Sequence, residues 1–224
     1  KGTLLIKDGK VVAVGKKVTI PKGTQIIDLS GKTIYPSFID VYSNFGIKTP
    51  TAPTNVSRVR QYEAGRKGFY WNDHIRPETD AFASFNYDAK KATGLLKAGF
   101  GLVNTHVQDG IVRGNGLLVA LNSNSSNAYR ILDTRSAQYL SFRKSRLSRQ
   151  AYPTSLMGST ALLRQVYFDA DWYASGNAKN KDRSLEAFNT NKNLVQIFDA
   201  GGNNLYSLRA DKVGDENGIQ YTIL

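Results

Sequence analysis

The chain has 224 residues, of which 41% are hydrophobic and 21% are charged, an ordinary balance for a globular protein. It contains no cysteine, which excludes disulfide bonds, thiolate metal sites and cysteine nucleophiles, and its two histidines strongly restrict any histidine-rich metal site. No stretch of the sequence has enough consecutive apolar residues for a transmembrane helix. The net charge of +12 permits nucleic acid, anionic surfaces or acidic ligands as partners, although dispersed Lys and Arg usually form a solvated face.

The first 35 residues predict a small β unit. Two apolar runs, 3–6 and 11–14, flank a turn at Asp8-Gly9, and this arrangement is a strong hairpin signal. Two further short apolar runs follow at 26–29 and 33–35. These strands are too few to close a core alone, so we expect them to pair with strands from elsewhere.

Residues 34–46 predict a buried strand that ends in polar side chains. Because side chains alternate between the two faces of a strand, Asp40, Tyr42 and Asn44 are predicted to point the same way. In α/β barrels, polar groups at the carboxyl ends of the strands form the active site. The polar stretch 46–85 then predicts a long irregular loop, of a kind that is usually functional or mobile.

The rest of the chain alternates predicted helices and strands. Helical patterns cover 86–97, 156–173, 185–193 and 203–218. Candidate N-caps are Asn86 for the first, Thr154 or Ser155 for the second, and Asn203 or Asn204 for the last. Apolar runs predict strands at 100–106, 117–121, 194–198 and 219–224, and glycines mark a turn at 110–116. This alternation favours parallel βαβ units. The last strand would be a bare edge, so we expect either a fragment or a barrel that something else completes.

Three runs carry a resemblance to a known family. They are GTLLIKDGKVVAVG at 2–15, IDLSGK at 27–32 and YPSFID at 35–40. Together they resemble the amidohydrolase superfamily, most closely its imidazolonepropionase-like members. Residues 194–224 are similar to the segment that carries the fifth and sixth barrel strands in such enzymes.

The resemblance implies an α/β fold in two parts. Residues 1–35 would contribute strands to a small β-sandwich, and residues 36–224 would form part of a TIM-like (β/α)8 barrel of the metallo-dependent hydrolase type. The family cofactor is zinc or another divalent metal. The middle of the chain looks like a large exported branch of the family, which implies a periplasmic or otherwise exported protein. The cysteine-free composition fits a cytoplasmic protein as well.

The metal ligands of the family are replaced in this sequence. In active members the first barrel strand ends in Asp-x-His-x-His, and both histidines bind the metal. The matching residues are Asp40, Tyr42 and Asn44, and the ligand histidine of the fifth strand corresponds to Asp199. A phenol with a pKa of about 10 and a neutral amide are poor zinc ligands. We therefore expect a degenerate site, without catalytic residues and without a metal or other cofactor in this segment.

A second polar set, His106, Asp109 and Arg113, follows a predicted strand and enters the glycine turn. A His–Asp pair is a candidate general base, and Arg113 is a candidate clamp for a carboxylate. The alternative is a loop network in which Arg113 bonds backbone carbonyls. His74 is more typical of a loop residue than of a metal ligand.

Two classes of function follow. The first is an amidohydrolase-like protein, whose family hydrolyses C–N bonds in cyclic amides, imides or dipeptide-like substrates with a metal-bound hydroxide. In this first class, the present segment would be catalytically degenerate and structural. The partner of the segment would be the remainder of a longer amidohydrolase chain or a second copy that completes the barrel. The alternative is a non-enzymatic module that binds a small anionic ligand through Arg113 and the basic surface.

A basic run also raises the question of polyanion binding. It comprises Arg143, Lys144, Arg146 and Arg149, with Tyr139, Phe142 and Tyr152 nearby. The run fits a solvated loop equally well, and no nucleic-acid motif accompanies it. Nucleic acid is therefore not an expected partner.

Overall fold

A computed structural model describes residues 2–48, 50–52, 66–122, 126–176 and 178–224, and the chain divides into two compact units, Lys1–Pro36 and Ser37–Leu224. In the first unit, β1 (Thr3–Lys7) and β2 (Lys10–Gly15) form the predicted antiparallel hairpin. The turn residues Asp8 and Gly9 both have positive φ, at 50° and 73°. This is the conformation that a two-residue hairpin turn requires.

The other two strands expected in the first unit do not form. Residues 26–29 and 33–35 have no regular secondary structure, and Ile26, Ile27, Ile34 and Tyr35 are exposed. An extended apolar segment becomes a strand only when its backbone groups pair with another strand. The apolar pattern is present, but these segments pair with no strand among the residues that the structure describes.

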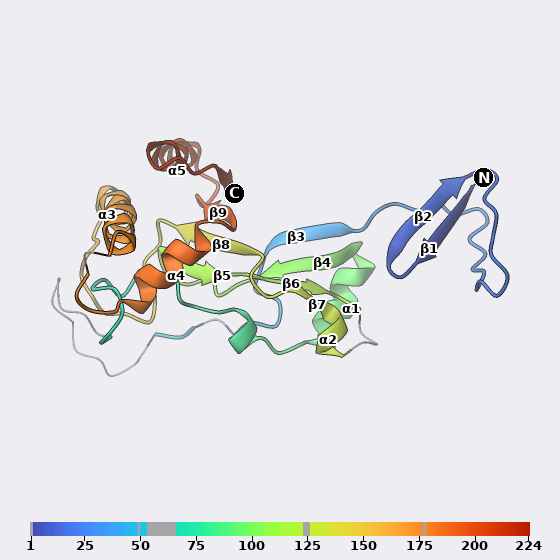
Figure 1. Ribbon diagram of the computed structural model, residues 1–224, viewed down its shortest axis with the longest axis horizontal. Helices are drawn as coiled ribbons and strands as arrows, with labels where there is room; N and C mark the ends of the chain where they lie inside the picture. Colours follow the sequence, from blue (N-terminus) through green and yellow to red (C-terminus); the bar gives the residue numbers. More distant parts are fainter. Residues whose placement is uncertain (1, 49, 53–65, 123–125, 177) are drawn as a thin grey trace. The chain divides into compact units, whose positions relative to one another are not determined.

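The second unit is a mixed α/β structure with two four-stranded sheets (Figure 1). One sheet has the order β3-β4-β6-β7, with β3 (Phe38–Ser43) parallel to β4 (Phe100–Thr105). Strands β6 (Leu117–Ala120) and β7 (Ile131–Asp133) continue it in antiparallel fashion. The short helices of this half are η1 (Phe82–Ser84), α1 (Ala89–Lys97) and α2 (Asn127–Arg130).

The other sheet has the order β10-β9-β8-β5. Strands β8 (Ala137–Ser141), β9 (Val195–Asp199) and β10 (Tyr221–Ile223) are parallel, and β5 (Val112–Asn115) is antiparallel to β8. Its helices are α3 (Leu156–Ala174), α4 (Arg183–Asn191) and α5 (Asn204–Glu216). The parallel strands with intervening helices confirm the βαβ arrangement predicted for this part of the chain.

Alternation along the strands separates two interiors. Leu140 and Phe198 belong to the core formed with α3, α4 and α5. Their neighbours Tyr139 and Ile197 point the opposite way and pack with Ala137 and with Tyr42 of β3. Because side chains two residues apart share a face, Asp199 lies on the same face as Ile197. This second interior is where the two sheets meet.

Two strands differ from the sequence-based expectation. The predicted glycine turn at 110–116 is wrong, because residues 112–115 form β5, which pairs with β8 at Val112 and Asn115 with a register shift between them, where Gly114 has φ of 82°. Strand β8 had no prediction, since polar Gln138 and Ser141 interrupt its apolar pattern. In the fold both side chains donate hydrogen bonds: Gln138 Nε2 donates to Gln196 Oε1 at 2.9 Å and Ser141 Oγ to Gly110 O at 2.9 Å.

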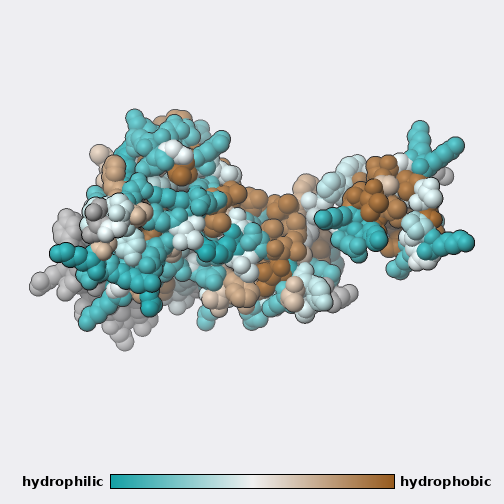
Figure 2. Space-filling model, in the orientation of Figure 1, coloured by the Kyte–Doolittle hydropathy of each residue, from teal (hydrophilic) through white to brown (hydrophobic). Residues whose placement is uncertain are grey.

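Neither four-stranded sheet closes on itself among the described residues. Strands β3 and β10 each have one edge without a partner there. The apolar side chains of β3 are exposed, with Phe38 at 66%, Ile39 at 51% and Val41 at 42%, and Figure 2 shows an apolar patch over this part of the second unit. None of the described helices has both the length and the apolar character to cross a membrane.

Candidate functional site

Three side chains from three strands meet at the end of β9. Tyr42 of β3 donates its hydroxyl hydrogen to Asp199 Oδ2 at 2.6 Å. Arg113 of β5 donates from Nη1 to the Tyr42 hydroxyl at 2.8 Å and from Nη2 to Asp199 Oδ2 at 3.0 Å. Its Nε donates to Gly110 O at 3.2 Å. We call Tyr42, Arg113 and Asp199 the central triad.

The central triad is a buried, charge-compensated cluster. The side chains of Arg113 and Asp199 are 3% and 10% exposed. Burial alone would raise the pKa of Asp199, but the hydrogen bond from Tyr42 and the charge of Arg113 outweigh it and hold that pKa below its usual value. Burial raises the pKa of Tyr42, so the phenol stays protonated and acts as a hydrogen-bond donor.

His106 lies beside the triad but is bonded to none of its members. Its ring stacks on Tyr139 with centroids 3.5 Å apart and an interplanar angle of 1°, and Tyr42 packs against it at 4.9 Å. Both ring nitrogens are buried without a hydrogen-bond partner among the described residues. Burial holds the pKa of His106 well below its usual value, with Arg113 adding to the effect, so the ring is neutral at pH 7.

Asp109 does not pair with His106, so the candidate His–Asp base does not form, and the loop-network alternative describes Asp109. Its Oδ2 accepts a hydrogen bond from Ser145 Oγ, and its Oδ1 accepts one from Arg146 N at 2.7 Å. Asp109 instead anchors the basic run to the body of the unit. Arg113 does bind a carboxylate, but it is the protein's own Asp199, and the Arg113 Nε donates to the Gly110 carbonyl, as in the loop-network alternative. Buried in this way, Arg113 is not available to a ligand at the surface.

His74 is a satisfied loop residue, as its sequence context favoured. Its Nδ1 accepts a hydrogen bond from Ser145 N at 3.1 Å, and its Nε2 lies 3.1 Å from Gln150 O. A carbonyl cannot donate, so the ring carries its hydrogen on Nε2 and is neutral. Burial lowers the pKa of His74 and favours this neutral form.

The three polar residues predicted to converge from the first strand separate in the structure. Asp40 Oδ1 accepts a hydrogen bond from Tyr42 N at 3.0 Å and is thus engaged locally. Asn44 is exposed and lies beyond Ser43, the last residue of β3. The extended geometry that would have aligned Asn44 with Tyr42 ends one residue too early. Of these three residues, Tyr42 is the one that belongs to the central triad.

The donor groups do not fit a zinc centre. Among the described residues, no group of three His, Cys, Asp or Glu side chains is placed to hold a metal ion. Asp199 is already neutralised by a guanidinium, and the Tyr42 phenol is protonated. A metal would have to displace Arg113 from a buried site and deprotonate a phenol whose pKa is raised.

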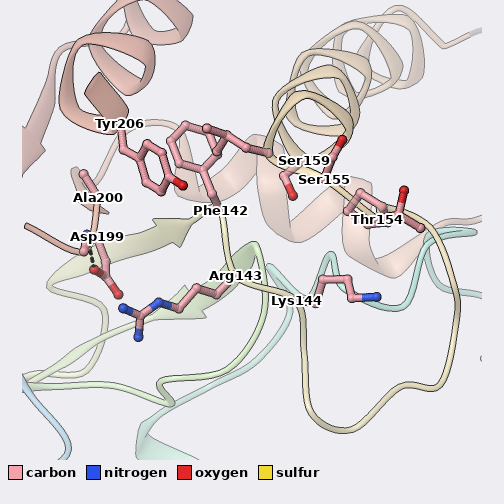
Figure 3. Close-up of a pocket in the computed structure, with 12 residues that line it drawn as sticks. Phe142, Arg143, Lys144, Thr154, Ser155, Ser159, Asp199, Ala200 and Tyr206 are labelled. Atoms are coloured by element: carbon pink, nitrogen blue, oxygen red, sulfur yellow. Dashed lines mark hydrogen bonds between the residues drawn. The ribbon is translucent and has the colours of Figure 1, made fainter. Parts of the chain in front are cut away.

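A cavity of about 320 Å³ lies next to the central triad, at the carboxyl ends of β8 and β9 (Figure 3). We call it the β8–β9 cavity. Its lining residues come from the segment after β8, the start of α3, the end of β9 and the first turn of α5: Phe142, Arg143, Lys144, Pro153, Thr154, Ser155, Leu156, Ser159, Asp199, Ala200, Gly201 and Tyr206. Sequence reasoning noted the basic run and the α3 cap separately, but the missing β8 prediction left them unconnected.

The basic run lies in an exposed loop, in which Arg143 and Lys144 also line the β8–β9 cavity. Arg143, Lys144, Arg146 and Arg149 are all exposed, while Ser145 and Gln150 between and beside them are buried. The buried residues anchor the loop and the basic ones extend from it. This is the solvated-loop alternative that the sequence left open.

Comparison with known proteins reveals one informative likeness. No protein-family model matches the chain, and no curated protein matches its sequence. A solved structure of an amidohydrolase from Thermotoga maritima MSB8 superposes with a TM-score of 0.72 at 20% identity, covering 98% of this chain and 58% of that chain. The chain therefore spans less than two thirds of the protein it matches. Likeness at this identity concerns the fold and leaves chemistry to the residues of the site. The chain has an amidohydrolase-like fold.

Proposed function

We propose that this chain is a catalytically silent part of an amidohydrolase-superfamily protein, related to the imidazolonepropionase-like branch. Its family reaction is the metal-dependent hydrolysis of non-peptide C–N bonds. Two observations support the assignment: the three motif runs in the first 40 residues, and the likeness to a solved amidohydrolase. The parallel pairs β3–β4 and β8–β9–β10 are compatible with a partial (β/α)8 barrel.

The central triad carries the proposal that hydrolysis has been lost. Metal-dependent hydrolysis needs an open metal position that holds a water and lowers its pKa. Here the guanidinium of Arg113, which stays protonated at any physiological pH, forms an ion pair with the carboxylate of Asp199. Asp199 is the residue that matches the fifth-strand metal ligand of the family. Arg113 thereby supplies a fixed positive charge where the family uses a metal ion. It cannot activate a water, so its role in this position is structural.

The proposed partner is the remainder of a longer amidohydrolase chain, with a second copy of this chain as the alternative. The unpaired edges of β3 and β10 support the proposal, since exposed strand edges are sites of further pairing. So does the exposed apolar surface of Phe38, Ile39 and Val41. Added strands at these edges would cover both features.

Metal analysis of the purified protein tests the proposed loss of chemistry. We expect far less than one equivalent of any transition metal after dialysis against zinc, and no hydrolysis of hydantoin or N-acyl amino acid substrates. The matched variant Arg113→Gln frees the Asp199 carboxylate and reports whether Arg113 is what excludes the cation. A stoichiometric metal in the unaltered protein that disappears in Asp199→Ala would refute the proposal.

A further inference from the structure

We infer that the β8–β9 cavity binds a small organic acid, a carboxylate attached to an aromatic or other apolar body. The inference goes beyond the proposed function, because it assigns a ligand to a cavity that the lost chemistry leaves unused. It depends on the lining residues and not on the state of any metal. Three independent features of the lining point to this class of ligand.

The first feature is an unmatched positive charge. Asp199, the one carboxylate in the lining, is fully engaged: Arg113 and Tyr42 bond its Oδ2, and Gly201 N donates to its Oδ1 at 2.9 Å. Arg143 extends towards the cavity beside Gly201, and a Cβ at Gly201 would lie 3.2 Å from its Nη2 (Figure 3). Arg143 forms none of the ion pairs found among the described residues. An arginine in this position favours a carboxylate partner.

The second feature is a hydroxyl group that faces the cavity. Ser159 is 3% exposed as a residue and lines the cavity from the first turn of α3. Its side chain has no hydrogen bond to any residue that the structure describes. A hydroxyl that lines a cavity and has no such partner is available to a bound molecule or to water. Ser159 and Arg143 come from different segments, and both face the same space.

The start of α3 adds to the preference for an anion. Ser155 caps the helix by accepting a hydrogen bond from Gly158 N at 3.1 Å, and the cap residue lines the cavity together with Leu156. The first N–H groups of a helix have no acceptor within the helix, and the helix dipole favours negative charge at this end. The start of α3 therefore adds to the attraction that Arg143 and Ser159 offer to an anion.

The third feature is an apolar wall. Phe142 and Tyr206 pack edge to face, with centroids 6.1 Å apart and an interplanar angle of 85°, and Leu156 and Ala200 extend the surface. Such a wall suits the body of an organic acid better than inorganic phosphate. The volume of about 320 Å³ is at the lower end for small-molecule sites, which excludes bulky ligands such as dinucleotides.

Paired ligands of equal shape test the inference. Phenylacetate and the uncharged phenylacetamide would be titrated into the purified protein, with binding measured by NMR chemical-shift changes. We expect the acid to bind at least about tenfold more tightly than the amide, since its charged hydrogen bonds to Arg143 are lost in the amide. Arg143→Gln should weaken the acid about tenfold and leave the amide unchanged. Ser159→Ala should weaken the acid several-fold.

Arg146→Gln is the matched control, because Arg146 is an exposed cation of the same loop that does not line the cavity. It should leave both affinities unchanged. Equal affinities for acid and amide, an unchanged acid affinity in Arg143→Gln, or no binding of either compound at millimolar concentration would each overturn the inference. A protein that holds a metal and still prefers the acid through Arg143 would refute the proposed function and leave this inference standing.

Discussion

Replacing Arg113 with methionine removes the positive charge of the central triad while keeping an unbranched aliphatic stem. The substitution deletes the hydrogen bonds to Tyr42, Asp199 and Gly110 and leaves the Asp199 carboxylate buried without a cation. With the two partners 3% and 10% exposed, this is a buried ion pair, and breaking such a pair by removing one partner costs about 3–5 kcal/mol. We expect Arg113→Met to lower the free energy of unfolding by that amount.

The assay is urea unfolding followed by far-ultraviolet circular dichroism at pH 7, arranged as a double-mutant cycle. Asp199→Leu alone should also be costly, because it leaves Arg113 buried and unpaired. The double variant Arg113→Met/Asp199→Leu should cost at least about 2 kcal/mol less than the sum of the single variants, since no uncompensated charge remains.

The exposed pair between Arg164 and Glu216 provides the control. Both side chains are 36% exposed, so Arg164→Met should cost no more than about 1 kcal/mol. Additive effects of the Arg113 and Asp199 substitutions, or a cost for Arg113→Met no larger than that for Arg164→Met, would show that the two side chains do not form a coupled buried pair.

Two further predictions concern stability. In the folded state the pKa values of His74 and His106 lie below the unfolded value of about 6.5. Below that pH the unfolded chain therefore takes up protons that the folded chain does not. The free energy of unfolding should then fall, as the pH is lowered, by up to about 1.4 kcal/mol per pH unit for each histidine. Urea unfolding between pH 7.5 and about 5.5 measures this slope. The variant His106→Phe should remove about half of it. A free energy of unfolding that does not change over this pH range would contradict the assignment of neutral histidine rings. Gly114→Ala should destabilise the protein by more than about 3 kcal/mol, because the residue has φ of 82° and a Cβ would lie 2.0 Å from Thr79 O. Gly218→Ala, at φ of 65° with no atom within 4 Å, should cost only the backbone strain of about 1–2 kcal/mol, and equal thermal shifts for the two variants would argue against the close contact.

Local sequence signals predicted most of the regular elements. Helix α3 begins after its Ser155 cap and α5 after Asn203, as the capping residues indicated. The Asp8-Gly9 turn specifies the hairpin β1–β2. These features depend on residues within a few positions of each other, so the sequence alone contains them. The cap of α1 is Asp88 and not the predicted Asn86, since both residue types are competent caps two positions apart.

The central site depended on tertiary structure. Tyr42 and Asp199 are 157 residues apart in sequence, and Arg113 lies 71 and 86 residues from them. The sequence placed Tyr42 and Asp199 at equivalent strand ends through their resemblance to ligand positions. The sequence did not pair these residues with Arg113, because the glycines around β5 predicted a turn in place of the strand that carries Arg113.

The sequence by itself determined helices α1, α3, α4 and α5, the hairpin, and the absence of histidine at positions 42, 44 and 199, since these follow from residue identity and short spacing. Only the tertiary structure decided that Arg113 neutralises Asp199, that Asp109 anchors a loop rather than a histidine, and that Arg143 and Ser159 share a cavity. The physical reason is that charge pairing and burial depend on which strands lie side by side. That in turn required β8, whose buried polar residues Gln138 and Ser141 donate their hydrogen bonds to acceptors distant in the chain.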